Sequence, residues 1–299
     1  MEVFKYIKKI KIKGLWSKFD INWELNPDVN VLSGINGSGK STILKLVDDT
    51  FIDLSISEDI AKNIEVILNT REVFKYGSTI EKIFSGENIG DKNQLLLGDG
   101  SKLIFDFIKS IDQQLLSREV IQKIANPEVK TELDFQLYKL IDKYNVYKGK
   151  LGSELSDAIL KMDKKELLKF RKEKTQWSEL FDKNVNRLFS STQKMMINNG
   201  ALSFKINNDV ISPYKLSSGE KQLLIILLTT LLQDGKPAIL LMDEPEISLH
   251  TDWQEELIKV IRTLNPNVQI ILATHSPSII MNGWFNKVTT VEEIKTPIK

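Results

Sequence analysis

The sequence of 299 residues contains no cysteine and only two histidines, His250 and His275. The absence of cysteine excludes disulfide bonds, thiolate catalysis and cysteine-bound zinc, and it fits a reducing compartment. The two histidines leave little material for a histidine-based metal site. The longest apolar run, Leu223 to Leu232, is too short to cross a bilayer and is interrupted by two threonines. The N-terminus has lysines but no apolar signal-peptide core, so we expect a cytoplasmic protein with no membrane partner.

An excess of charge of one sign is also missing. The chain has 41 basic and 40 acidic residues, so it is not the strongly positive molecule that non-specific nucleic-acid binding favours. A local patch could still serve that purpose, because residues 161–174 hold seven basic and three acidic residues in a helical pattern. We interpret this stretch first as a solvated helix face, with contact to DNA as the alternative.

The two ends of the chain carry an α/β pattern. Residues 3–34 alternate like strands and run into a glycine-rich loop, and residues 41–52 then repeat apolar side chains at helical spacing. After residue 201 the order is helix, strand, helix, strand. Both of these strands, Ala238 to Met242 and Gln269 to Thr274, are continuous apolar runs. Such runs are typical of parallel strands that are covered on both faces.

The middle of the chain has a different pattern. Two short apolar runs, Gln94 to Leu97 and Leu103 to Phe107, flank an Asp-Gly pair and predict a hairpin. Charged helical segments follow at Thr131 to Tyr147 and Ser153 to Phe189, and two glycines between them predict a linker. A symmetric helical hairpin over this block would have two helices of about 40 Å each, too short for a long coiled-coil arm.

The glycine-rich loop from Gly34 to Ser41 reads G-I-N-G-S-G-K-S, which matches the phosphate-loop pattern G-x-x-x-x-G-K-S at every fixed position. Its glycines let backbone amides point inward around phosphates, and the following helix adds its positive N-terminal end. Lys40 would reach the β and γ phosphates, and the Ser41 hydroxyl would bind Mg²⁺. The expected nucleotide contacts are Asn36, Gly37, Ser38, Gly39, Lys40, Ser41 and Thr42.

A pair of acids, Asp243 and Glu244, follows the first of the two apolar strands. Open α/β sheets bind their ligands at the carboxyl ends of such strands. Asp243 is placed to hold Mg²⁺ through water, and Glu244 to polarise the attacking water as a general base. Two acids after a strand would more often be a helix cap and a surface charge. Beside an intact phosphate loop, the catalytic interpretation is favoured.

Three further motifs follow the phosphate loop in order. Leu216 to Glu220 reads L-S-S-G-E, Asp243 to His250 reads D-E-P-E-I-S-L-H, and Thr274 to Pro277 reads T-H-S-P. Together these motifs resemble an ABC-type ATPase head, and more closely the RecF, SMC and OLD-like branch. The resemblance implies an α/β P-loop NTPase of ABC-ATPase type, with a mixed β-sheet, flanking helices and a helical insertion. It also implies ATP and Mg²⁺ as cofactors.

The resemblance covers both ends of the chain and matches the middle only loosely, so we expect a split domain. Residues 1–52 and 201–299 would form one nucleotide-binding domain of ABC type. Residues 53–200 would form a hairpin plus a helical insertion that leaves this domain as an arm or lobe.

The resemblance also implies that Ser217 and Gly219 contact the γ-phosphate of ATP held by a second chain. Ser217 precedes a helix whose amide-rich N-terminus suits an anion. Simple capping of that helix is the alternative, and it is compatible with phosphate contact. Ser218 stands where the family usually has glycine, a departure that is common in this branch.

His275 matches the switch histidine of the family, which would touch the γ-phosphate and the catalytic water. Lys40, Glu244 and His275 are therefore the expected catalytic residues. His250 lies in the loop after the catalytic glutamate, and the resemblance places it at the seam between two heads rather than in catalysis.

Relatives carry a glutamine that senses Mg²⁺ and couples the nucleotide to the inserted domain. Gln113 is our candidate for this metal contact, with Gln114 equally placed in the sequence and Gln94 as a further alternative.

The biological role is the hardest part to predict. The chain lacks the long arms of chromosome-maintenance relatives, and the stretch after His275 is too short for a nuclease domain of the OLD type. This combination resembles the stand-alone ATPases of bacterial anti-phage systems, which work with a separately encoded effector, often a nuclease. The Thr131 to Tyr147 helix and the tail Gly283 to Thr289 suggest the PARIS or Septu kind. We expect ATP to close two heads, in a homodimer or a higher oligomer, and hydrolysis to reopen them.

Two other roles stay open. A RecF-like repair ATPase would bind DNA through residues 161–174 and show DNA-stimulated activity that falls steeply with salt. A transporter ATPase subunit is disfavoured, because nothing in the sequence offers a membrane-coupling partner.

Overall fold

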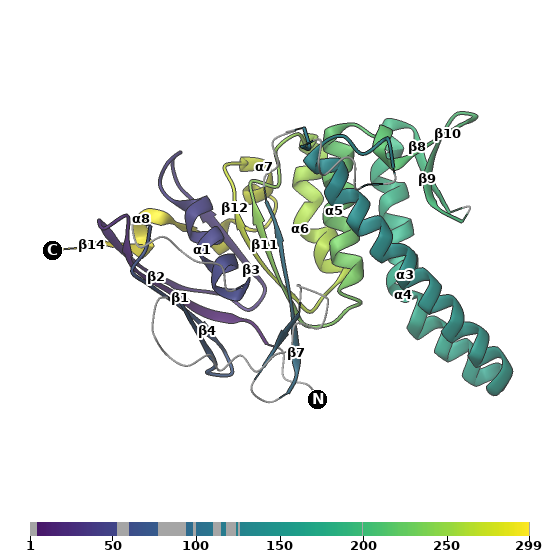
Figure 1. Cartoon of the computed structure of the whole chain (residues 1–299), viewed down its shortest axis with the longest axis horizontal. Coiled ribbons are helices and arrows are strands. Elements are labelled where there is room, and N and C mark those ends of the chain that lie inside the picture. The colour runs from purple at the N-terminus through teal and green to yellow at the C-terminus, as the bar shows by residue number, and fades with distance from the viewer. Residues whose placement is uncertain are drawn as a thin grey trace.

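Three β-sheets and their helices form a head from which one helical pair projects (Figure 1). The computed structural model describes residues 5–52, 60–76, 94–97, 100–109, 115–117, 124, 126–198 and 200–298. Within these ranges no helix is both long and apolar enough to span a bilayer.

The central sheet is mostly parallel. Its strands are ordered β13 (Val288–Thr290), β3 (Val29–Ser33), β12 (Val268–Ala273), β11 (Ala238–Asp243), β7 (Lys102–Ile108) and β6 (Gln94–Leu96). Neighbours pair in parallel, apart from the antiparallel hairpin of β6 and β7. The predicted fold class, an α/β fold with a mixed sheet and flanking helices, is confirmed.

Burial explains why β11 and β12 read as unbroken apolar runs. Every residue of both strands is buried. In β11, Leu240 and Met242 join the core of α5 (Ser218–Leu232) and α6 (Thr251–Leu264). Ile239 and Leu241 join a second core with α1 (Lys40–Ile52) on the other face. A strand covered on both sides favours apolar side chains at nearly every position.

A second, antiparallel sheet covers α1. Its order is β14 (Lys295–Pro297), β2 (Phe19–Glu24), β1 (Ile7–Leu15), β4 (Asn63–Leu68) and β5 (Val73–Tyr76). The buried Gln269 of β12 joins the two sheets, because its side-chain amide accepts from the Ile7 amide and donates to the Ile7 carbonyl, each over 2.8 Å. The amide therefore acts as a strand partner for the first residue of β1 and fixes β12 against this sheet.

The helical pair consists of α3 (Glu132–Lys161) and α4 (Lys164–Phe189). By helix rise these are about 45 Å and 39 Å long, close to the predicted hairpin. The predicted linker at Gly149 and Gly152 is wrong, since α3 runs through both glycines. Each costs about 1 kcal/mol in a helix, and the helix nevertheless continues through the buried Leu151 between them. The chain reverses instead at Met162, where Asp163 caps α4.

Residues 53–200 do not behave as one insertion in the structure. β4 and β5 extend the antiparallel sheet beside β1, and β7 pairs with β11 in the central sheet. The sequence could not show this, because such pairings join strands far apart in the chain. After the helical pair, a three-stranded sheet of β8 (Lys194–Asn198), β9 (Leu202–Ile206) and β10 (Asp209–Ile211) leads into α5.

Candidate nucleotide site

The glycine-rich loop lies between β3 and α1, at the carboxyl end of the central sheet. Lys40 begins α1, and its Nζ folds back to donate to the carbonyls of Gly34 at 3.0 Å and Ile35 at 3.2 Å. The buried Ser38 hydroxyl has no hydrogen-bond partner among the described residues. The strand, loop and helix expected of a phosphate loop are therefore present, with a lysine and an unused hydroxyl in the loop.

Asp243 ends β11 beside the start of α1. The Ser41 hydroxyl donates to Asp243 Oδ1 over 2.9 Å. Burial raises the pKa of the Asp243 carboxyl above its usual range, and the neighbouring Glu244 charge adds to this, against the hydrogen bond from Ser41. Two oxygen ligands from one protein suit Mg²⁺, which keeps waters and phosphate oxygens as its other ligands.

Glu244 and His275 meet across the mouth of the loop. His275 Nε2 lies 3.8 Å from Glu244 Oε1 and 2.6 Å from Lys40 Nζ. Because an ammonium group only donates, a hydrogen bond from Lys40 requires an unprotonated Nε2. Glu244 has a φ of 45°, a strained conformation for a residue with a side chain, of the kind that collects at functional sites. The three residues expected to be catalytic therefore lie together.

Glu246 holds the segment that carries His275. Its Oε1 accepts from the backbone amides of His275 at 2.9 Å and Ser276 at 3.2 Å, and from the Thr274 hydroxyl. Sequence analysis included Glu246 only within the Asp243 to His250 motif and missed this contact. No local pattern indicates it, because the two segments meet only in the folded chain.

These elements surround a cavity of about 430 Å³. Its volume lies within the range of small-molecule sites. The residues that line it are Trp16, Asn36, Gly37, Gly39, Lys40, Ser41, Thr42, Glu244 and His275. Trp16 was missed, and its only sequence signal is a large aromatic residue in the turn between β1 and β2. The Trp16 ring can lie close to the loop because residue 39 is glycine. Gly39 has a φ of 110°, and a Cβ at this position would lie 3.0 Å from the Trp16 ring.

Ser217 and Gly219 do not line this cavity. Ser217 caps α5, where its Oγ accepts from the Glu220 amide and the Glu220 carboxylate accepts from the Ser217 amide over 2.8 Å. A Cβ on Gly219 would lie 2.1 Å from the Ser248 carbonyl oxygen, so only glycine allows this approach. The start of α5 therefore packs on the loop that follows Glu244, and Ser217 itself stays exposed.

Two ion pairs tie the start of α5 to the two roots of the helical pair. Glu220 accepts from Lys194 Nζ, just after α4, and Lys221 Nζ donates to Asp134 at the start of α3, each over 2.7 Å. Burial raises the pKa of both carboxyls, but these hydrogen bonds and those from backbone amides outweigh burial and hold the two pKa values below their usual ranges.

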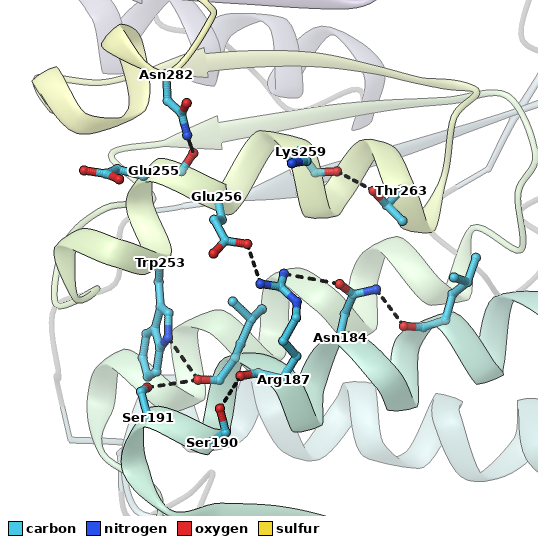
Figure 2. A network of polar contacts seen from close by, with 12 residues as sticks. Asn184, Arg187, Ser190, Ser191, Trp253, Glu255, Glu256, Lys259, Thr263 and Asn282 are labelled. Carbon is cyan, nitrogen blue, oxygen red and sulfur yellow. Dashed lines mark hydrogen bonds and ion pairs between the residues drawn. The ribbon is translucent and has the colours of Figure 1, made fainter.

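A second set of contacts joins the end of α4 to α6 (Figure 2). The Trp253 indole donates to the Leu188 carbonyl over 3.2 Å, and Arg187 pairs with Glu256. On the other side of α6, Asn282 donates to the Glu255 carbonyl over 2.6 Å. Because Asn282 follows α7 (Pro277–Met281), α6 lies between the root of the helical pair and the segment carrying His275.

The remaining candidates are less informative. Gln113 and Gln114 lie outside the described residues. Gln94 is exposed in β6, at the edge of the central sheet, where it pairs with Ile104. His250 is exposed and caps α6 through Nδ1, as a surface residue outside the cavity.

Comparison with known proteins places this site in a family. Residues 29–282 match a family model described as "AAA domain, putative AbiEii toxin, Type IV TA system". The chain is 24% identical over 248 residues to the Retron Vc95 probable ATPase of Vibrio cholerae, covering 77% of this chain and 46% of that protein. It is also 24% identical over 315 residues to the Septu protein PtuA of Bacillus thuringiensis, covering 94% and 74% of the two chains. The chain thus spans less than half the length of the Vibrio relative.

Solved structures show the same fold. An SMC head bound to the C-winged helix domain of ScpA superposes with a TM-score of 0.54 at 18% identity, covering 98% of this chain and 97% of that one. The Smc head of Pyrococcus furiosus with an extended coiled coil gives 0.51 at 17% identity, covering 93% and 92%. The expected resemblance to SMC-type heads and to the Septu kind of ATPase is confirmed.

Proposed function

The chain belongs to this family of AAA domains, and on that premise we propose that it binds and hydrolyses ATP with Mg²⁺. The observation that carries the proposal is that Lys40, Ser41, Glu244 and His275 line one cavity and that Ser41 donates a hydrogen bond to Asp243. These residues come from three separate parts of the sequence, and each has the chemistry that a nucleoside triphosphate and its metal require.

The roles follow from the side chains. Lys40 and the amides of Asn36 to Ser41 would hold the phosphates, while Ser41 and Asp243 would hold Mg²⁺, which supplies charge neutralisation when it is bound. Glu244 would accept a proton from the attacking water, since its carboxylate lies at the cavity wall. His275 Nε2 would orient that water by accepting a hydrogen bond from it, and Glu246 would keep the histidine backbone in place.

We also propose that two chains share each site. Ser217 and Gly219 do not line the cavity of their own chain, yet Ser217 is exposed at the amide-rich start of α5. Such a helix start suits an anion. The γ-phosphate held by a second copy would meet it if two heads closed on ATP. A homodimer, or a larger assembly of such dimers, would result.

Closure of two heads would move the helical pair, which we call the arm (residues 131–189). Glu220 and Lys221 belong to the same helix turn as Gly219, and each is paired with one root of the arm. Movement of α5 against a second head would therefore pull on both roots. On this proposal residues 131–189 form the inserted domain, and the strands on either side belong to the head.

The proposed role is that of a sensor or scaffold subunit in anti-phage defence, working with a separate effector such as a nuclease. Support comes from the relatives, which are named as a retron ATPase and a Septu protein. In this role, ATP-driven closure would switch the effector through the arm.

Head closure is the sharpest test. Light scattering with ATP, in a Glu244→Gln background, should show dimers that Ser217→Arg and Ser217→Asp both lose, while the single chain still binds ATP. Aspartate keeps the helix cap but repels the γ-phosphate, so it separates capping from phosphate contact. Ser156→Arg, at an exposed serine of the arm, is the matched control. Closure that survives Ser217→Asp would refute the shared site.

A further inference from the structure

The tip of the arm exposes apolar side chains that nothing in the described chain covers. Leu160 is 83% exposed, Ile159 63%, Leu168 60% and Met162 36%. We call these four residues the arm tip. They surround the reversal between α3 and α4, at the end of the arm farthest from the head (Figure 1). Along the rest of the arm, Tyr144, Leu151 and Phe181 are buried, and Val146 is an isolated exposed apolar residue.

Cations surround the arm tip. Leu168 lies three or four residues from Lys164, Lys165, Arg171 and Lys172, so all four flank it on the surface of α4. Residues 161–174 carry seven basic and three acidic residues, a net charge of +4. Among the described residues, the ion pairs in this stretch use only Lys169 and Lys174. The four cations around Leu168 take no part in those pairs.

The combination of exposed apolar side chains and cations indicates what kind of molecule the arm tip binds. A nucleic acid would use the cations, but its phosphates would leave the leucines exposed. A second copy of the arm tip would bring another +4 to the same place, which disfavours self-association. A bilayer would need a continuous apolar face, whereas the exposed Leu168 is flanked on α4 by Lys164, Lys165, Arg171 and Lys172. A protein surface with an apolar centre and acidic rim satisfies both the leucines and the cations.

We propose that the arm tip is a docking site for an acidic, amphipathic segment of a partner protein. Leu160 and Leu168 would enter its apolar face, and Lys164, Lys165, Arg171 and Lys172 would meet its carboxylates. The identification of this partner with the effector rests on the proposed function; the docking surface itself does not.

The probe is a fluorescein-labelled helical peptide with leucines along one face and glutamates on both sides of it. Its anisotropy is measured against the full-length chain. Two control peptides each change one property. One replaces every glutamate by lysine, and the other keeps the composition but scrambles the order so that no apolar face forms. We expect only the first peptide to bind, and its affinity to fall as salt rises from 0.05 to 0.5 M.

Variants then locate the contact. Leu160→Ser with Leu168→Ser should weaken the acidic peptide about tenfold or more, and Lys164→Glu with Lys165→Glu should do the same. Val146→Ser, at a residue of α3 that is 69% exposed but distant from the tip, should leave binding unchanged. ATPase activity is measured in parallel, and these variants should retain it.

Equal peptide binding by the wild type and the Leu160→Ser, Leu168→Ser variant would overturn the proposal. The proposal would also be overturned if duplex DNA or anionic vesicles displaced the peptide and themselves bound more weakly to the Leu160→Ser, Leu168→Ser variant. That result would make DNA or a membrane the occupant. A chain without ATPase activity that still binds the peptide at the tip would refute the proposed function and leave this inference standing.

Discussion

The Ser41 hydroxyl donates to Asp243 Oδ1 over 2.9 Å, joining residues 202 positions apart in the sequence. This bond brings the start of α1 and the end of β11 together at one edge of the sheet. It places the Ser41 hydroxyl oxygen and an Asp243 carboxylate oxygen side by side. Because burial already raises the Asp243 pKa, a divalent cation at this position would stabilise the ionised carboxylate.

The first prediction tests that metal contact. Asp243→Asn keeps an oxygen that can accept from Ser41, so the fold should persist, but the charge that attracts Mg²⁺ is lost. Calorimetry should show that Mg²⁺ no longer strengthens ATP binding, with a loss of about 10- to 100-fold in metal-dependent affinity. Asp252→Asn, on the exposed start of α6, is the control. Full Mg²⁺ dependence in the Asp243 variant would remove this carboxylate from the proposed metal site.

Glu244 provides the second prediction. Glu244→Gln should bind ATP as tightly as the wild type, because the phosphates are held by the loop and not by this side chain. Hydrolysis should fall by about 10²- to 10⁴-fold, the contribution of a positioned general base. Phosphate release measured at saturating ATP gives the rate. A variant with near-normal turnover would mean that another group accepts the proton.

The third prediction concerns the ion pair between the arm and α5. Lys194→Met leaves the buried Glu220 carboxylate without its cationic partner. This loss should cost about 3–5 kcal/mol of unfolding free energy. Denaturant unfolding measures the cost. Lys205→Met, at an exposed lysine on the neighbouring strand β9, should cost little. If the pair also transmits closure, the Lys194 variant should need more ATP to form dimers in the Glu244→Gln background.

Acid titration offers an independent check of the same pair. The Glu220 pKa is held below its usual value of 4.5, so the pair stabilises the fold above that pH and loses its contribution as pH falls through the folded-state pKa. In Lys194→Met the buried carboxyl would instead gain from protonation. The difference in melting temperature between wild type and Lys194→Met should therefore shrink as pH falls from 6 to below 4.5. A constant difference would show that Lys194 acts through packing alone.

The sequence predicted the parts of this site that depend on local order. The phosphate loop, the acids Asp243 and Glu244 and the histidine after β12 each belong to a short motif next to a recognisable strand. The structure brings the loop, Glu244 and His275 to one cavity. Continuous apolar runs at β11 and β12 predicted a parallel sheet because strands covered on both faces have no polar side.

The parts that sequence reasoning missed depend on contacts between distant segments. The pairing of β7 with β11, the hold of Glu246 on the His275 backbone and the position of Trp16 join segments far apart in the chain. The linker predicted at Gly149 and Gly152 was wrong although the signal was local. A local helix-breaking signal did not end the helix, which continues through both glycines to Lys161.

Trp16 carries the last prediction. Its side chain lines the cavity beside the phosphate loop, and Gly39 leaves room for the ring. We expect the indole to stack on the adenine base, a contact worth roughly 1–3 kcal/mol. Trp16→Ala should then weaken ATP binding by about tenfold or more, and Trp16→Phe should recover most of it. Inorganic tripolyphosphate, which has no base, should bind the wild type and Trp16→Ala equally. A parallel loss of tripolyphosphate binding would mean that Trp16 supports the loop rather than the base.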